Sequence, residues 1–193
     1  MERQFIQDSD FSKVPFLPGV YSWYYPLIIF ENDTFDSFYS RISFFLDYSQ
    51  FGQEDGFSII SSTSKWREWE LTIKSKINPA KTLKNNWLEI KENQNLRNAI
   101  EKSSVMFQPL YVGCAKDLSK RIKDHIDGKT GFSDRFIVLC KEYKKKYPNQ
   151  NYPFGAFELE RLHLSFDVLQ TKKEATLFEK FVQTITDPNL SKA

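Results

Sequence analysis

Residues 109–128 read Pro-Leu-Tyr-Val-Gly-Cys-Ala-Lys-Asp-Leu-Ser-Lys-Arg-Ile-Lys-Asp-His-Ile-Asp-Gly, and this stretch carries the most specific structural pattern in the chain. It predicts a short strand over 110–112, a turn at Gly113 and one helix that begins after an N-cap residue, Asp117. Gly128 predicts a left-handed end to that helix. Apolar residues at four-residue spacing predict a buried stripe on the helix: Leu118, Ile122 and Ile126.

Three polar side chains of the same stretch are expected to lie close together. Arg121 and His125 are four residues apart, so they share a second face of the helix, offset from the apolar one. Tyr111 stands on the strand just before the turn. The pattern therefore aims a phenol, a guanidinium and an imidazole into one small volume.

The order of these residues resembles the GIY-YIG nuclease family. Tyr111-Val112-Gly113, followed by Arg121 and His125, is similar to the second half of the family motif. The stretch Gly19-Val20-Tyr21, preceded by Pro18, is similar to the first half.

Two further family elements lie near the end of the chain. A glutamate on a late helix, inside an Ala-x-x-Phe-Glu stretch, corresponds here to Glu179. The last element, a terminal asparagine, corresponds to Asn189, although it follows the glutamate by ten residues where the family usually has about twelve. His163 is expected to be structural.

The resemblance implies an α/β fold with a small three-stranded antiparallel sheet flanked by helices. In the family the two tyrosine tripeptides lie on adjacent strands, whereas here 90 residues separate Tyr21 from Tyr111. We therefore expect a nuclease domain formed by residues 1–25 and 109–193. Residues 26–108 would be an α+β insertion in the hairpin, either a substrate-binding or a dimerisation element, and loop-closure entropy permits such a length if the insertion packs on itself.

The resemblance also implies a metal-dependent endonuclease that hydrolyses phosphodiester bonds of DNA, restriction-like or anti-phage. Glu179 would bind Mg²⁺ or Mn²⁺, and Arg121 would clamp the scissile phosphate through its planar guanidinium. His125 would orient the attacking water or contact a phosphate oxygen. Either tyrosine could be the general base; we favour Tyr21, with a pKa lowered by nearby cations, and Asn189 would complete the site.

Composition allows a nucleic-acid partner without requiring one. The formal net charge is +2, and the hydrophobic content of 40% is enough for a core. Lysines gather in two runs that would contact DNA, although such runs are usually solvated faces: Lys116, Lys120 and Lys123, then Lys144 and Lys145.

Cysteine content and hydropathy favour a cytoplasmic protein without membrane contact. Cys114 and Cys140 are too few for a disulfide scaffold, and neither a signal peptide nor an apolar run of membrane-spanning length is visible. Cleavage of both DNA strands would need a homodimer or two visits. The alternative interpretation is a catalytically inactive module on the same fold that binds nucleic acid or assembles a complex.

Outside this stretch, periodicity predicts further elements. Strands are expected at 20–25, 57–61, 69–73 and 162–169, and helices at 34–45, 96–105, 132–147 and 172–185. Residues 1–15 show no periodic pattern and are expected to lie on the surface or to contact a partner.

Overall fold

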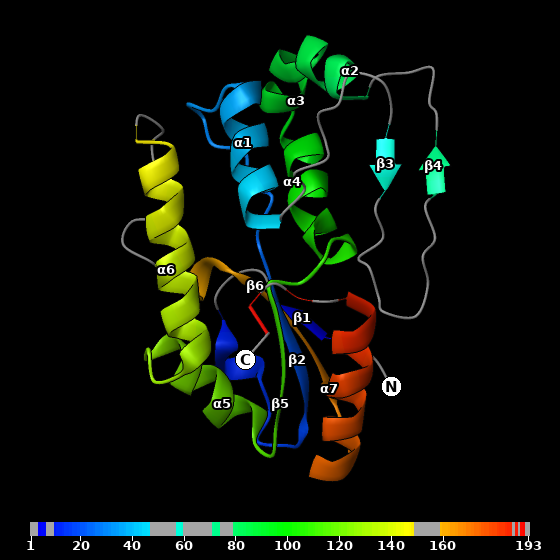
Figure 1. Ribbon diagram of the computed structural model, residues 1–193, viewed down its shortest axis with the longest axis vertical. Coiled ribbons are helices and arrows are strands. Elements are labelled where there is room, and N and C mark those ends of the chain that lie inside the picture. Colours follow the sequence, from blue (N-terminus) through cyan, green and yellow to red (C-terminus); the bar gives the residue numbers. More distant parts are fainter. Residues whose placement is uncertain are drawn as a thin grey trace. The chain divides into compact units, whose positions relative to one another are not determined.

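The computed structural model describes residues 4–6, 10–46, 57–59, 71–73, 79–148, 159–186, 188 and 190–191. The chain divides into two compact units (Figure 1). The first contains Met1–Pro26 and Ser104–Ala193, and the second contains Leu27–Ser103. The assignment of a nuclease role to the first unit, and of an insertion role to the second, stays a prediction.

The first unit is built on an antiparallel sheet, which confirms a mixed α/β fold but not the expected three strands. Its strand order is β1 (Gln4–Ile6), β6 (His163–Val168), β2 (Gly19–Tyr24) and β5 (Tyr111–Ala115). Residues 1–15, which were expected to lie on the surface or to contact a partner, contribute β1, and β1 pairs with β6 as a fourth strand. A three-residue edge strand is too short to show alternation in the sequence.

Helices cover both faces of this sheet (Figure 1). On one face lie α5 (Leu118–Ile126) and α6 (Gly131–Lys146), and on the other lies α7 (Lys172–Thr186). Three short 3₁₀ helices complete the described part of the unit: η1 (Phe11–Lys13), η2 (Ser103–Met106), which begins at the boundary residue, and η4 (Leu159–Arg161). Among the helices that the structure describes, none is both long and apolar enough to span a membrane.

The central strand β2 is buried along its whole length because it has helices on both sides. Toward α5 and α6 it presents Trp23, whose ring stacks on Phe132 with centroids 6.0 Å apart. Toward α7 the core contains Val20, Val112 and Ala175, and the half-buried Phe178 packs against them. Successive residues of β2 and β5 therefore face different helices.

Local signals set the ends of the helices. Asp117 accepts a hydrogen bond from the backbone N–H of Lys120 at 2.9 Å, and Gly128 has φ +71°, so both predicted ends of α5 are confirmed. Helix α7 begins with a capping box in which Glu174 accepts from the N–H of Thr171 and Thr171 accepts from the N–H of Glu174.

The second unit is mainly helical in its described part. It contains α1 (Phe35–Leu46), α2 (Pro79–Asn85), α3 (Trp87–Glu92), α4 (Gln94–Lys102) and a strand pair, β3 (Phe57–Ile59) with β4 (Leu71–Ile73). The helix predicted over 34–45 is confirmed. Helix α2 begins at Pro79, since a proline suits the first position of a helix.

Candidate active site

Sheet register brings the two tyrosine tripeptides together. Tyr21 pairs with Gly113 and Trp23 pairs with Tyr111 across the β2–β5 ladder. The two tyrosines therefore lie diagonally on one face of the sheet, with ring centroids 6.0 Å apart. Tyr21 is buried and Tyr111 is half-buried.

Gly113 makes room for Tyr21. A Cβ at position 113 would lie 2.6 Å from the Tyr21 Oη and 2.7 Å from the Tyr111 ring. The turn expected at Gly113 was wrong, because β5 continues through it to Ala115. The first tripeptide follows the same rule, since a Cβ on Gly19 would lie 2.4 Å from the Asp167 carbonyl oxygen. Both glycines are required by close packing of their neighbours.

His125 supports Tyr21 from the interior. Its Nε2 lies 2.6 Å from the Tyr21 Oη, and its Nδ1 lies 2.5 Å from the Thr130 Oγ1. Burial, together with the charges of Arg121 and Arg135, lowers the pKa of His125 to about 3, so the imidazole is neutral at physiological pH. Its side chain is fully buried, so the expected direct contact of His125 with water or phosphate is not available in this arrangement.

Tyr21 lacks the lowered pKa that a general base needs. Burial raises the pKa of Tyr21 well above its usual value, and the neighbouring Tyr111 raises it further. Arg121 acts in the opposite direction but does not outweigh burial. The expectation that nearby cations lower this pKa was therefore wrong, because only 1% of the Tyr21 surface is exposed.

Arg121 is held by the two phenols. Burial alone would lower the pKa of this half-buried guanidinium, but hydrogen bonds and charge interactions with Tyr21 and Tyr111 outweigh burial and raise it. In the part of the chain that the structure describes, no carboxylate forms an ion pair with Arg121. The guanidinium therefore keeps an uncompensated positive charge at the edge of the buried cluster.

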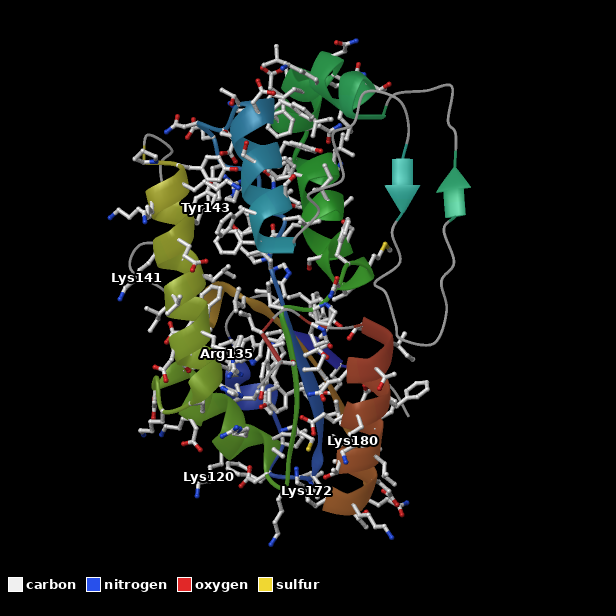
Figure 2. All side chains as sticks on the ribbon, in the orientation of Figure 1. Lys120, Arg135, Lys141, Tyr143, Lys172 and Lys180 are labelled. Atoms are coloured by element: carbon white, nitrogen blue, oxygen red, sulfur yellow. The ribbon has the colours of Figure 1, made fainter. Side chains whose placement is uncertain are left out.

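Glu179 lies on the opposite face of the sheet from the tyrosines. The Cys114 thiol donates to its Oε2 at 2.8 Å, and the Gln183 amide lies 3.4 Å from its Oε1. The Lys172 ammonium, which lies at the start of α7 (Figure 2), donates to the Cys114 Sγ at 2.6 Å. Burial raises the pKa of the Cys114 thiol, and Glu179 adds to this effect.

The structure therefore forms two polar groups where the family pattern implies one. Cys114 and Tyr111 are three positions apart on β5, so their side chains point to opposite faces. Strand β5 lies at the edge of the sheet and separates Glu179 from Arg121. A ligand that touches both groups would have to reach around this edge.

Glu179 is the protein ligand that the resemblance assigns to the metal ion. Among the described residues, no group of three or more histidine, cysteine, aspartate or glutamate side chains could hold a metal. Mg²⁺ is commonly held by one or two carboxylates and keeps several waters. A half-buried carboxylate with an amide beside it is compatible with that mode of binding.

The end of the chain runs along the outer edge of β5. The N–H of Leu190 donates to the carbonyl of Leu110 at 2.8 Å. The Ser191 hydroxyl donates to the carbonyl of Val112 at 3.0 Å and accepts from its N–H at 2.7 Å. Asn189, the predicted last element of the site, lies outside the described residues.

The lysines predicted to contact DNA lie on the surface of the first unit. Lys116, Lys120 and Lys123 are exposed at and beside α5, and Lys144 and Lys145 are exposed near the end of α6. Figure 2 shows Lys120 and Lys141 pointing away from the sheet. These positions agree with a DNA-binding surface and equally with solvated helix faces.

Thr130 and Ser133, which lie behind His125, were not predicted from the sequence. Their signal was present, since a threonine followed three residues later by a serine precedes the apolar part of α6, and Thr130 is its N-cap.

Comparisons with models of known protein families, with curated proteins and with solved structures found no match. What the chain does is therefore inferred from its own residues.

Proposed function

We propose that this chain is a metal-dependent endonuclease that hydrolyses phosphodiester bonds of DNA by GIY-YIG-type chemistry. The observation that carries the proposal is Arg121. This guanidinium is half-buried, lies beside the two phenols Tyr21 and Tyr111, and has no carboxylate partner among the described residues. An arginine in this state binds phosphate strongly, because its planar donors match two phosphate oxygens and its charge is not neutralised internally.

The remaining side chains of the cluster have distinct roles in this proposal. Tyr111 is half-buried, so its hydroxyl can meet a substrate or an attacking water. Tyr21 and His125 are fully enclosed and act as positioning residues behind Arg121. Arg121 would stabilise the charge that develops on the phosphoryl oxygens in the transition state.

Glu179 would hold the metal ion together with water. When bound, Mg²⁺ or Mn²⁺ supplies charge stabilisation at the phosphate and lowers the pKa of a bound water. The exposed lysines at α5 and α6 would contribute backbone contacts, which position DNA without reading its sequence. Binding through them would weaken steeply as salt is raised.

The test is cleavage of supercoiled plasmid and single-stranded DNA with Mg²⁺ or Mn²⁺. We expect metal-dependent cutting by the wild type and its loss in Glu179→Gln and Tyr111→Phe. Two matched controls, Glu142→Gln on the exposed face of α6 and Tyr147→Phe at its end, should cut like the wild type. Cutting that persists in Glu179→Gln would contradict the metal assignment, and cutting that persists in Tyr111→Phe would contradict the role of the phenol.

One observation favours an alternative, a nucleic-acid-binding module without catalysis. Glu179 and Arg121 lie on opposite faces of β5, and the Glu179 carboxylate already accepts hydrogen bonds from Cys114 and Gln183. This alternative predicts salt-sensitive DNA binding by the wild type with no cleavage of any substrate at any metal concentration. Cleavage that depends on both Glu179 and Arg121 would exclude it.

A further inference from the structure

Behind Arg121, a row of hydrogen-bonded side chains runs into the interior of the first unit. It passes from Tyr21 to His125, then to Thr130, Ser133 and back to the carbonyl oxygen of His125. All four side chains are at least nine-tenths buried, so water does not complete their hydrogen bonding from outside. The direction of each hydrogen bond can therefore be assigned from the donors and acceptors themselves.

The assignment starts at Ser133. A carbonyl oxygen can only accept, so the Ser133 hydroxyl donates its one hydrogen to the His125 carbonyl at 2.7 Å. The Thr130 and Ser133 oxygens are 3.0 Å apart, so Thr130 must donate in that bond. The Thr130 hydrogen is then used, and the 2.5 Å contact with His125 requires the imidazole Nδ1–H to donate to Thr130.

The hydrogen-bonded row continues from His125 to Tyr21. A neutral imidazole carries one hydrogen, so His125 Nε2 is an acceptor and the Tyr21 hydroxyl donates to it at 2.6 Å. Both lone pairs of the Tyr21 oxygen are then left for the other side, where Arg121 and Tyr111 lie close enough to affect the pKa of Tyr21. Because the Tyr21 hydrogen is used by His125, Tyr21 can act toward Arg121 and Tyr111 only as an acceptor.

We propose that Thr130 is a positioning residue that sets the direction of this entire row, so that Tyr21 presents only lone pairs toward Arg121 and Tyr111. The consequence for catalysis rests on the proposed nuclease function. A guanidinium that faces an acceptor can donate to it and keep its remaining donors for phosphate, and Tyr111 can donate to Tyr21 while its lone pairs accept from an attacking water.

The local structure explains why Thr130 can do this. Helix α5 ends at Ile126 and α6 begins at Gly131, so a short corner carries Thr130 to the back of His125. Thr130 is also the N-cap of α6, with the Ser133 N–H 3.4 Å from its Oγ1. The residue that begins one helix thus determines which nitrogen of a histidine on the preceding helix carries the hydrogen.

The decisive experiment is nitrogen NMR of ¹⁵N-histidine-labelled full-length protein at neutral pH. The chain has two histidines, and His163→Gln assigns the second signal set. We expect His125 in the wild type and in Thr130→Ser to be the Nδ1–H tautomer. Thr130→Val keeps the side-chain volume but removes the acceptor, so His125 should shift toward the Nε2–H tautomer. Thr184→Val, which removes an exposed hydroxyl on α7, should change nothing.

An Nε2–H tautomer in the wild type, or an unchanged Nδ1–H tautomer in Thr130→Val, would overturn the proposal. A second measurement tests the consequence for catalysis: Thr130→Val should lower kcat about tenfold with little change in KM, and Thr130→Ser should restore it. A wild type that never cleaves DNA defeats the proposed function alone, because the tautomer measurement still decides the role of Thr130.

Discussion

Two arginines in this chain, the buried Arg41 and the half-buried Arg121, differ in what neutralises them. Arg41, on α1 of the second unit, donates to both carboxylate oxygens of Asp33, at 2.8 and 2.6 Å, and to the carbonyl of Ile28 at 2.8 Å. Only 2% of Arg41 is exposed. Its guanidinium also lies 4.8 Å from the centre of the Phe30 ring. The charge of Arg41 is thus neutralised inside the unit that contains it.

Arg121 has the opposite arrangement. Its partners are the neutral phenols Tyr21 and Tyr111, and no carboxylate among the described residues pairs with it. An arginine that is paired with a carboxylate inside the fold belongs to the core, whereas an arginine beside uncharged hydroxyls remains available to an external anion.

The largest expected effect is on stability, from Arg41→Met. Removal of one partner leaves the Asp33 carboxylate buried and unpaired, which should lower the free energy of unfolding by about 3–5 kcal/mol. Urea unfolding followed by tryptophan fluorescence would measure this loss, since Trp87 also bonds to Asp33. Lys84→Met, which breaks the exposed pair with Asp36, is the control and should change stability little. Equal losses of stability in both variants would show that the buried Arg41–Asp33 pair contributes no more than an exposed ion pair.

The next effect is on activity, from Arg121→Gln. Loss of one preorganised donor to the transition state should lower kcat/KM by about 10²–10³-fold. Stability should fall by about 1 kcal/mol or less, because only hydrogen bonds to neutral groups are lost. Plasmid cleavage and urea unfolding of the same preparation separate the two effects. A loss of stability as large as that of Arg41→Met would mean that Arg121 is a core residue.

A smaller effect is expected from Gly113→Ala, which disturbs the support of Arg121 without touching its charge. The new Cβ would meet the Tyr21 Oη at 2.6 Å, and His125 holds that oxygen from behind. Overpacking of this kind costs about 1–3 kcal/mol of stability. At Gly131→Ala, the nearest atom is at an ordinary 3.5 Å, so this control should keep or slightly raise stability. If Gly113→Ala leaves the free energy of unfolding unchanged, Tyr21 is not tightly held.

Stability should also depend on pH, because both buried histidines have a lowered pKa. Burial lowers the pKa of His125 from 6.5 to about 3, with contributions from Arg121 and Arg135, and burial lowers the pKa of His163 from 6.5 to about 4. Between pH 6.5 and 4 the unfolded chain binds protons on both histidines and the folded chain does not. Stability should therefore fall as the pH falls through this range, by about 1.4 kcal/mol per pH unit for each histidine at most.

Urea titrations at several pH values would measure this slope, and His125→Gln should flatten it. An unchanged slope in His125→Gln would place the pH dependence elsewhere. A steeper loss at higher pH would contradict the sign of both pKa shifts.

The sequence predicted best where a structure depends on near neighbours in the chain. Asp117 and Gly128 mark the ends of α5 because caps act within one helical turn. The helices at α1, α6 and α7 follow from apolar periodicity. Strand β1 was not predicted, because it is only three residues long and gains its stability from β6, a segment more than 150 residues away.

The adjacency of the strands that carry Tyr21 and Tyr111, which are 90 residues apart, could be proposed only from the resemblance, and the register pairs Tyr21 with Gly113. The separation of Glu179 from Arg121 could not be anticipated. It depends on which face of β5 each helix covers, and a residue list contains no information on that choice.

The amino-acid sequence by itself determined the residue types of the candidate site, their order, and the local turns and caps that carry them, because these depend on interactions within a few residues. Tertiary structure alone decided burial, and burial decided the chemistry. It made His125 neutral, raised the pKa of Tyr21, and left Arg121 without a counter-charge among the described residues. Such electrostatic states depend on the loss of water and on distant partners, which exist only once the chain is folded.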